Sequence, residues 1–221
     1  MSPRGLAVSC LLLVVAAGFP EMPTAVAADY VFSLSGAYHE PTNARDSYAL
    51  VYEKGAPRFG LLATRTTPLA GGRLSVRLGY DYLRASGEAV AFGGGGNSWI
   101  KAGVRSTLQI HRLLAGLRGD FVRSGTMTGY GVAALGAARV EEGSGGGLSS
   151  SSACPAFELA AGGELHATDW LTIGLEAAYS WLPGATGEGG AAQAFGEDDL
   201  GGVSVGVVTS VLWRRSDHGL E

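Results

Sequence analysis

The sequence predicts an all-β fold, a closed antiparallel up-and-down barrel that crosses a membrane with its strands. Apolar and polar residues alternate with a period of two along most of the chain, which places them on opposite faces of β-strands. Of the 221 residues, 36 are glycine and only 16% are charged. An ordinary soluble domain has ~7% glycine and roughly 25% charged residues. The mean hydropathy is +0.18, and no run of ~20 apolar residues follows the N-terminus, which excludes a bundle of membrane-spanning helices.

The charge balance excludes other classes of protein. The chain holds 16 Lys and Arg residues against 20 Asp and Glu residues, a net charge of −4. No block of basic residues occurs and the isoelectric point is about 5.6, so nucleic acid is not an expected partner. Hydrophobic residues make up 46% of the chain, which is too many for a disordered protein.

Residues 1–27 have the pattern of a secretory signal peptide. Arg4 precedes an apolar stretch at 6–19, and small residues at 25–27 form a cleavage site. A transmembrane anchor is the competing interpretation, but the apolar stretch is short for a bilayer. Cleavage leaves Cys154 as the single cysteine, so no internal disulfide is expected.

Ten strands are the preferred interpretation of the alternating segments. In 73–84, Leu74 and Val76 share one face while Ser75 and Arg77 share the other. The ten segments, in order, are 30–38, 46–54, 58–66, 73–84, 98–108, 113–123, 128–140, 156–166, 170–181 and 201–213. Four-residue spacing in 99–117 also fits a helix, although its glycines disfavour one.

The connections follow from an even strand number, with both ends of the barrel in the periplasm. Turn residues at 54–57 and 168–169 predict tight turns. Long outer loops are expected at 141–155 and 182–200. Ten strands also require one long periplasmic connection, 85–97, where short turns are usual. Eight strands, obtained by merging two adjacent pairs of segments, are the alternative.

Strand length and aromatic placement favour a membrane barrel over a soluble sandwich. Several segments have 11–13 residues, enough to cross the hydrocarbon core when tilted. Large aromatic residues fall at the strand ends, where an aromatic girdle meets the two membrane surfaces. The predicted girdle consists of Tyr30, Tyr38, Trp99, Phe157, Trp170, Trp181 and Trp213.

Charged residues within the strands are expected to face the lumen, because a charge facing lipid is costly. These predicted lumen-lining residues are Arg77, Asp81, Lys101, Arg105, Arg118, Asp120, Arg139, Glu158, Glu164 and Glu176. In a barrel of eight to ten strands the lumen is narrow and mostly filled by side chains. We expect a network that closes the lumen, with a small polar channel as the alternative.

Two stretches carry a resemblance to a known family. The run 129–140, followed by a Ser/Gly loop, and the run 157–181 are similar to small outer-membrane β-barrels of Gram-negative bacteria, of the OmpA type or porin family. The resemblance implies a barrel over 28–213 in the bacterial outer membrane. It implies the lipid of that membrane and the barrel-assembly machinery as partners, and no obvious protein partner. Trp213 is followed by a polar tail, 214–221, whereas such barrels usually end on an aromatic residue.

The expected function is a structural or passive small-pore role without catalysis. No cofactor is expected, and the four histidines share no spacing of metal ligands. Two other classes stay open. One is a barrel-embedded enzyme that acts on lipid A or peptides, for which His39 and the acids at 197–199 are the candidate residues. The other is a secreted soluble β-sandwich that binds a ligand.

Overall fold

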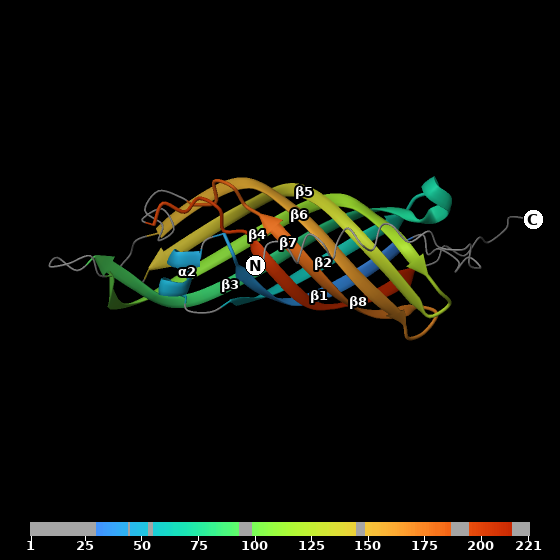
Figure 1. Ribbon diagram of the computed structural model, residues 1–221, viewed down its shortest axis with the longest axis horizontal. Helices are drawn as coiled ribbons and strands as arrows, with labels where there is room; N and C mark the ends of the chain where they lie inside the picture. The colour runs from blue at the N-terminus through green and yellow to red at the C-terminus, as the bar shows by residue number, and fades with distance from the viewer. Residues whose placement is uncertain are drawn as a thin grey trace, which may run out of the picture.

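Eight strands form a closed antiparallel barrel in the computed structural model, in which β8 pairs with β1 (Figure 1). The structure describes residues 30–43, 45–52, 55–92, 99–144, 149–186 and 195–213. The strands are β1 (Tyr30–Pro41), β2 (Ala56–Thr66), β3 (Leu74–Phe92), β4 (Trp99–Arg123), β5 (Met127–Ser144), β6 (Ser149–His166), β7 (Leu171–Trp181) and β8 (Gly202–Trp213). Two short helices, α2 (Arg45–Val51) and the 3-10 helix η1 (Leu69–Gly72), connect β1 to β2 and β2 to β3. The predicted fold class is confirmed.

The preferred number of ten strands is wrong, and the alternative of eight is correct. Segments 98–108 and 113–123 are one strand, β4, because no turn residue interrupts the chain between Leu108 and Leu113. Residues 46–51 of the predicted strand 46–54 belong to the helix α2 instead. Its buried residues Tyr48, Val51 and Tyr52 have the spacing of one face of a helix, a pattern that alternation concealed.

Two predicted connections are also wrong, because the strands continue through them. Residues 85–92 extend β3, so the chain reverses at the opposite end of the barrel from the one expected for 85–97. Most of the predicted loop 141–155 belongs to β5 and β6. The signal peptide at 1–27 and the polar tail at 214–221 lie outside the described residues and stay predictions. No helix in the described part of the chain is long and apolar enough to cross a membrane.

The stagger of the strands fixes the size of the barrel. A path from partner to partner around the ring starts at Tyr30 and returns to β1 at Glu40, ten residues further along (30 to 40). Between them it passes through Arg65, Val76, Leu117, Ala133, Leu159, Tyr179 and Val203. For eight strands this stagger gives a tilt of about 40° and a lumen just wide enough for side chains to fill.

The two ends of the barrel differ. The inner end holds η1, the start of β1 and the end of β8, whereas the outer end holds α2. Strands β3 to β6 extend beyond the other four at the outer end (Figure 1). Inside this extension the side chains are apolar and buried, among them Leu83, Leu108, Ile110 and Val140.

Helix α2 closes the outer end from within. Tyr48, Val51 and Tyr52 are buried in the apolar cluster, and the Tyr52 hydroxyl donates to Glu142 Oε1 at 2.8 Å. Burial raises the pKa of the Tyr52 hydroxyl above its ordinary range, and the Glu142 carboxylate adds to the effect. A Cβ at Gly87 of β3 would lie 1.8 Å from the Val51 carbonyl oxygen, so only glycine lets the helix approach this strand.

The variant Gly87→Ala tests this packing. The added methyl group should push α2 out of the barrel, because overpacking a filled site costs about 1–3 kcal/mol. We expect chymotrypsin to cut after Tyr48 or Tyr52 about tenfold faster, since cleavage follows the population of the opened form. Gel electrophoresis over time measures the rate. The control is Gly36→Ala, whose Cβ would meet nothing within 4 Å, and equal cleavage of both variants would contradict the packing.

Candidate functional site

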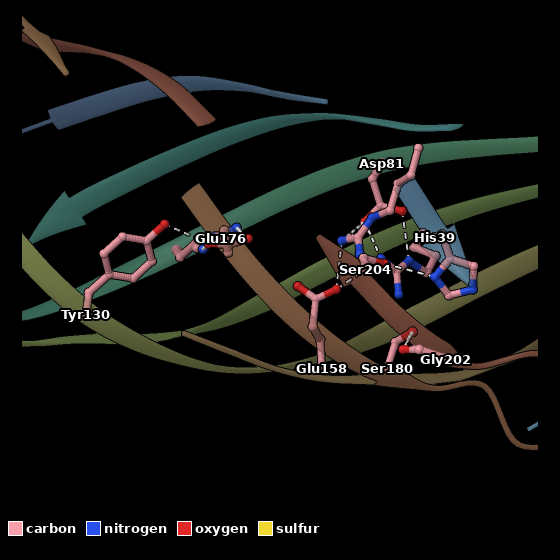
Figure 2. A network of polar contacts seen from close by, with 11 residues as sticks. His39, Asp81, Tyr130, Glu158, Glu176, Ser180, Gly202 and Ser204 are labelled. Carbon is pink, nitrogen blue, oxygen red and sulfur yellow. Dashed lines mark hydrogen bonds and ion pairs between the residues drawn. The ribbon is translucent and has the colours of Figure 1, made fainter. Parts of the chain in front are cut away.

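Four charged side chains form a layer across the outer half of the lumen, which we call the outer charge layer: Arg58, Asp81, Arg112 and Glu158. The Arg58 guanidinium donates to Asp81 Oδ2 at 3.0 Å and to Glu158 Oε2 at 2.7 Å. Arg112 donates to both oxygens of Asp81, at 2.7 and 3.0 Å, and to Glu158 Oε2 at 3.0 Å. Each arginine therefore binds both carboxylates, and Figure 2 shows Asp81 and Glu158 facing a common centre.

A second set, the inner charge layer, lies nearer the inner end: Arg77, Arg118, Asp120, Glu164 and Glu176. Arg77 forms two hydrogen bonds to Glu176, at 2.6 and 2.9 Å. Arg118 forms two to Glu164, at 2.9 and 2.7 Å, and one to Asp120 at 2.9 Å. These paired geometries are the strongest form of arginine–carboxylate contact.

Tyr130 contacts both ion-paired groups of the inner charge layer, the one of Arg77 and the one of Arg118. Its hydroxyl donates to Glu176 Oε2 at 3.0 Å (Figure 2), and the Arg118 guanidinium lies 3.8 Å from its ring centroid. Gly162 leaves the space that this ring fills, since a Cβ there would lie 2.6 Å from the Tyr130 hydroxyl oxygen. The ring is fully buried.

The bridges cross the barrel from wall to wall. Arg58 is in β2 and Glu158 in β6, four strands away in a ring of eight. Arg77 in β3 and Glu176 in β7 have the same separation. Strands four apart in an eight-stranded ring face each other, so each bridge spans the diameter of the lumen. Side chains thus cross the lumen at two levels.

The sequence placed most of these charged residues on inward positions, but three of its ten assignments are wrong. Arg77, Asp81, Arg118, Asp120, Glu158, Glu164 and Glu176 lie inside the barrel. Lys101 and Arg105 are exposed on the outer stretch of β4. Arg139 is exposed as well, with 67% of its side chain accessible, because it lies between the buried residues Ala138 and Val140.

Two arginines of the outer charge layer were missed. Arg112 lay in the gap between the predicted segments 98–108 and 113–123, and Arg58 was the first residue of the predicted segment 58–66, directly after the predicted turn 54–57. Their parity was the available signal. Arg112 is next to Leu113 and Arg58 is next to Phe59, and both of these apolar residues are exposed on the outward face. Alternation therefore turns the two arginines inward.

The predicted aromatic residues point outward at both ends of the strands. Tyr30, Trp170 and Trp213 are exposed at the inner end, where Tyr30 is the strand partner of Trp213. Toward the outer end, Tyr38 and Phe157 are exposed and Trp181 is the partner of Phe157. The side chain of Trp99 lies outside the described residues.

In the described part of the chain, the candidate enzyme residues His39 and Asp199 bind different partners. His39 Nδ1 shares a hydrogen bond with Ser204 Oγ at 2.9 Å (Figure 2), and both residues are buried. Asp199 instead accepts backbone N–H groups from Leu182 and Gly201, at 2.8 and 2.7 Å. It also accepts the Asn43 amide at 2.8 Å, so it has a structural role in joining two outer connections.

Metal ligation finds no support in the described part of the chain, where no three His, Cys, Asp or Glu side chains gather as a metal site. Both carboxylate oxygens of Asp199 are already occupied by protein donors.

Comparison with solved structures supports the same architecture. The fold is similar to Neisserial surface protein A (NspA), with a TM-score of 0.53 at 12% identity over 83% of this chain and 96% of that one. Ail of Yersinia pestis matches with a TM-score of 0.47 at 13% identity over 85% and 99% of the two chains. No family model matches the sequence, and no curated protein matches it. The resemblance predicted from the sequence is thereby confirmed at the level of the fold.

Removing one partner of a wall-to-wall bridge tests its energetic role. Arg77→Met should lower the free energy of unfolding by about 3–5 kcal/mol, because it leaves the Glu176 carboxylate buried without its cation. The pair Arg77→Met/Glu176→Leu should recover most of that loss. Urea unfolding in lipid vesicles, followed by tryptophan fluorescence, measures both.

The matched control is Arg139→Met, which breaks the exposed ion pair with Glu141. This change should cost no more than ~1 kcal/mol. If Arg77→Met were as mild as the control, the buried bridge would have no special role in stability.

Proposed function

We propose that this protein is an outer-membrane β-barrel with a sealed lumen, whose role is structural: it anchors and presents an outer surface. The observation that carries the proposal is the pair of bridges between opposite walls, Arg58–Glu158 and Arg77–Glu176. A pore for solutes needs a continuous water-filled path, and these bridges interrupt it at two levels. The apolar cluster around α2 supports a third closure at the outer end.

An exposed apolar belt supports the membrane location. Large apolar side chains cover the outside of the strands, such as Leu34, Leu135 and Leu175, which are 63%, 64% and 65% exposed. Soluble proteins rarely expose a continuous apolar patch of more than a few hundred Å². The Tyr30 and Tyr38 side chains bound this belt on β1, eight residues apart, or about 21 Å along the barrel axis at ~40° tilt. An apolar band of ~25 Å is typical of outer-membrane barrels.

The outer extension supports a role at the surface. Beyond the belt, the outward residues of β3 to β6 become polar, including Arg84, Gln109, Arg139 and Ser151. This stretch therefore stands in water with an apolar interior of its own. Outer-membrane lipid and the barrel-assembly machinery stay the proposed partners.

A passive pore is the alternative that an efflux experiment separates from the sealed barrel. Vesicles that contain the protein should retain entrapped ions and small sugars as well as protein-free vesicles do. Gel mobility before and after boiling shows in the same sample that the barrel is folded. Efflux from vesicles of the folded wild-type protein would contradict the sealed lumen.

Opening the lumen should require both closures to be removed. One variant carries four substitutions that remove both bridges: Arg58→Ala, Glu158→Ala, Arg77→Ala and Glu176→Ala. A second variant replaces residues 45–52 with a Gly/Ser linker. Each alone should stay closed, because the other barrier persists. The combined variant should leak small ions. Leakage from the linker variant alone would mean that the charge layers do not seal the lumen.

A further inference from the structure

A patch of aromatic and basic side chains lies on the outside of β3, β4 and β5, where the apolar belt ends. We call it the outer-rim patch: Tyr80, Tyr82, Arg84, Gln109, His111 and Arg139. Strand pairing puts Tyr82, His111 and Arg139 in one row and Arg84 opposite Gln109 in the next. None of the closures of the lumen involves these residues, since all of them face outward.

Contacts within the patch hold its centre in a fixed arrangement. The Tyr80 hydroxyl and His111 Nδ1 share a hydrogen bond of 2.8 Å, and the Tyr82 and His111 ring centroids are 4.9 Å apart. The Tyr82 hydroxyl donates to Gln109 Oε1 at 3.2 Å. An exposed surface that is already ordered loses less conformational entropy when it binds a ligand.

Two exposed arginines flank this ordered centre. Arg84 and Arg139 lie on strands separated only by β4 and differ by two residues in register, so their Cα atoms are about 12 Å apart. Two arginine side chains can reach a single anion across that distance. Glu141 pairs with Arg139 at 2.7 Å, but an exposed ion pair contributes little free energy and exchanges readily for a stronger anion.

The surroundings identify the kind of anion. Directly toward the belt lie the exposed apolar side chains Leu113 and Leu135, which fit acyl chains. At the same level the outward residues of β1, β2, β6 and β8 are Glu40, Pro57, Pro155 and Val203. Among the residues described at this level, the outward arginines therefore lie on the β3–β5 side of the rim, above an apolar surface.

We propose that the outer-rim patch binds the phosphate of an outer-leaflet glycolipid, with Arg84 and Arg139 as the phosphate ligands and Leu113 and Leu135 against its acyl chains. The inference rests on the proposed membrane location and goes beyond it by assigning a lipid class to one face. Bidentate arginine contacts to phosphate provide the recognition. His111 and the two tyrosines provide the ordered surface beside it.

The test uses the folded full-length barrel in detergent and two probes, bisphosphorylated lipid A and the same lipid without its phosphates. Titration followed by native mass spectrometry gives the dissociation constants. We expect bisphosphorylated lipid A to bind about tenfold more tightly than the dephosphorylated lipid. Arg84→Gln/Arg139→Gln should abolish this preference and leave the binding of the dephosphorylated lipid unchanged.

The matched control is Arg65→Gln/Arg73→Gln, which removes two exposed arginines at the inner end of the barrel and should change each constant less than about twofold. Equal binding of both lipids to the wild type, or an equal effect of both double variants, would overturn the inference. Competition by millimolar inorganic phosphate would overturn it as well, because a free anion would then satisfy the site. Boiling-dependent gel mobility and vesicle retention, measured on the same preparations, test the proposed function separately.

Discussion

Backbone pairing in hydrocarbon is the constraint on which the rest of this structure depends. Lipid offers no hydrogen-bond partner, so a sheet that crosses a membrane must close on itself. Closure with eight strands and a stagger of ten residues, from Tyr30 to Glu40, fixes a narrow lumen. Long inward side chains can then reach across the lumen, so a charge on one strand can pair with a charge on the strand opposite, as Arg58 does with Glu158 and Arg77 with Glu176.

The arginines and carboxylates of the lumen share their ion-pair partners. In the outer charge layer two arginines and two acids bind one another crosswise, so no charge depends on a single contact. Glycines opposite the largest groups make this possible. Gly162 leaves space for Tyr130, and Gly174 leaves space for the Glu164 side chain, whose Cγ would lie 2.8 Å from an added Cβ. The glycine-rich composition is thus tied to a filled lumen as well as to turns.

Alternation was enough to predict the all-β barrel, because strand parity follows directly from the residue order. It could not fix the strand count. Tyr48, Leu50 and Tyr52 alternate as they would in a strand, whereas Tyr48, Val51 and Tyr52 share one face of a helix, and only the tertiary site beside Gly87 decides between the two. The inward assignment of Lys101 and Arg105 rested on their charge, whereas both have the parity of the outward residues Leu113 and Leu117 in β4. Arg58 and Arg112 were missed for another reason, since Arg58 was the first residue of its predicted segment and Arg112 lay in the gap between two segments.

Strand β4 has an apolar outward face in its inner stretch and a polar outward face in its outer stretch. In its inner stretch Leu113 and Leu117 face outward, whereas Arg112 and Arg118 face the lumen. In its outer stretch the polarity is reversed, so that Gln109 faces outward while Leu108 and Ile110 are buried. The period of two continues along β4 while the apolar residues change from one face of the strand to the other. The period alone therefore does not reveal the reversal. The exchange lies between Ile110 and Leu113, at the outer edge of the proposed membrane belt. Helix α2 packs against the apolar inside of the barrel beyond that level, and the outer-rim patch lies on the outside at the same level.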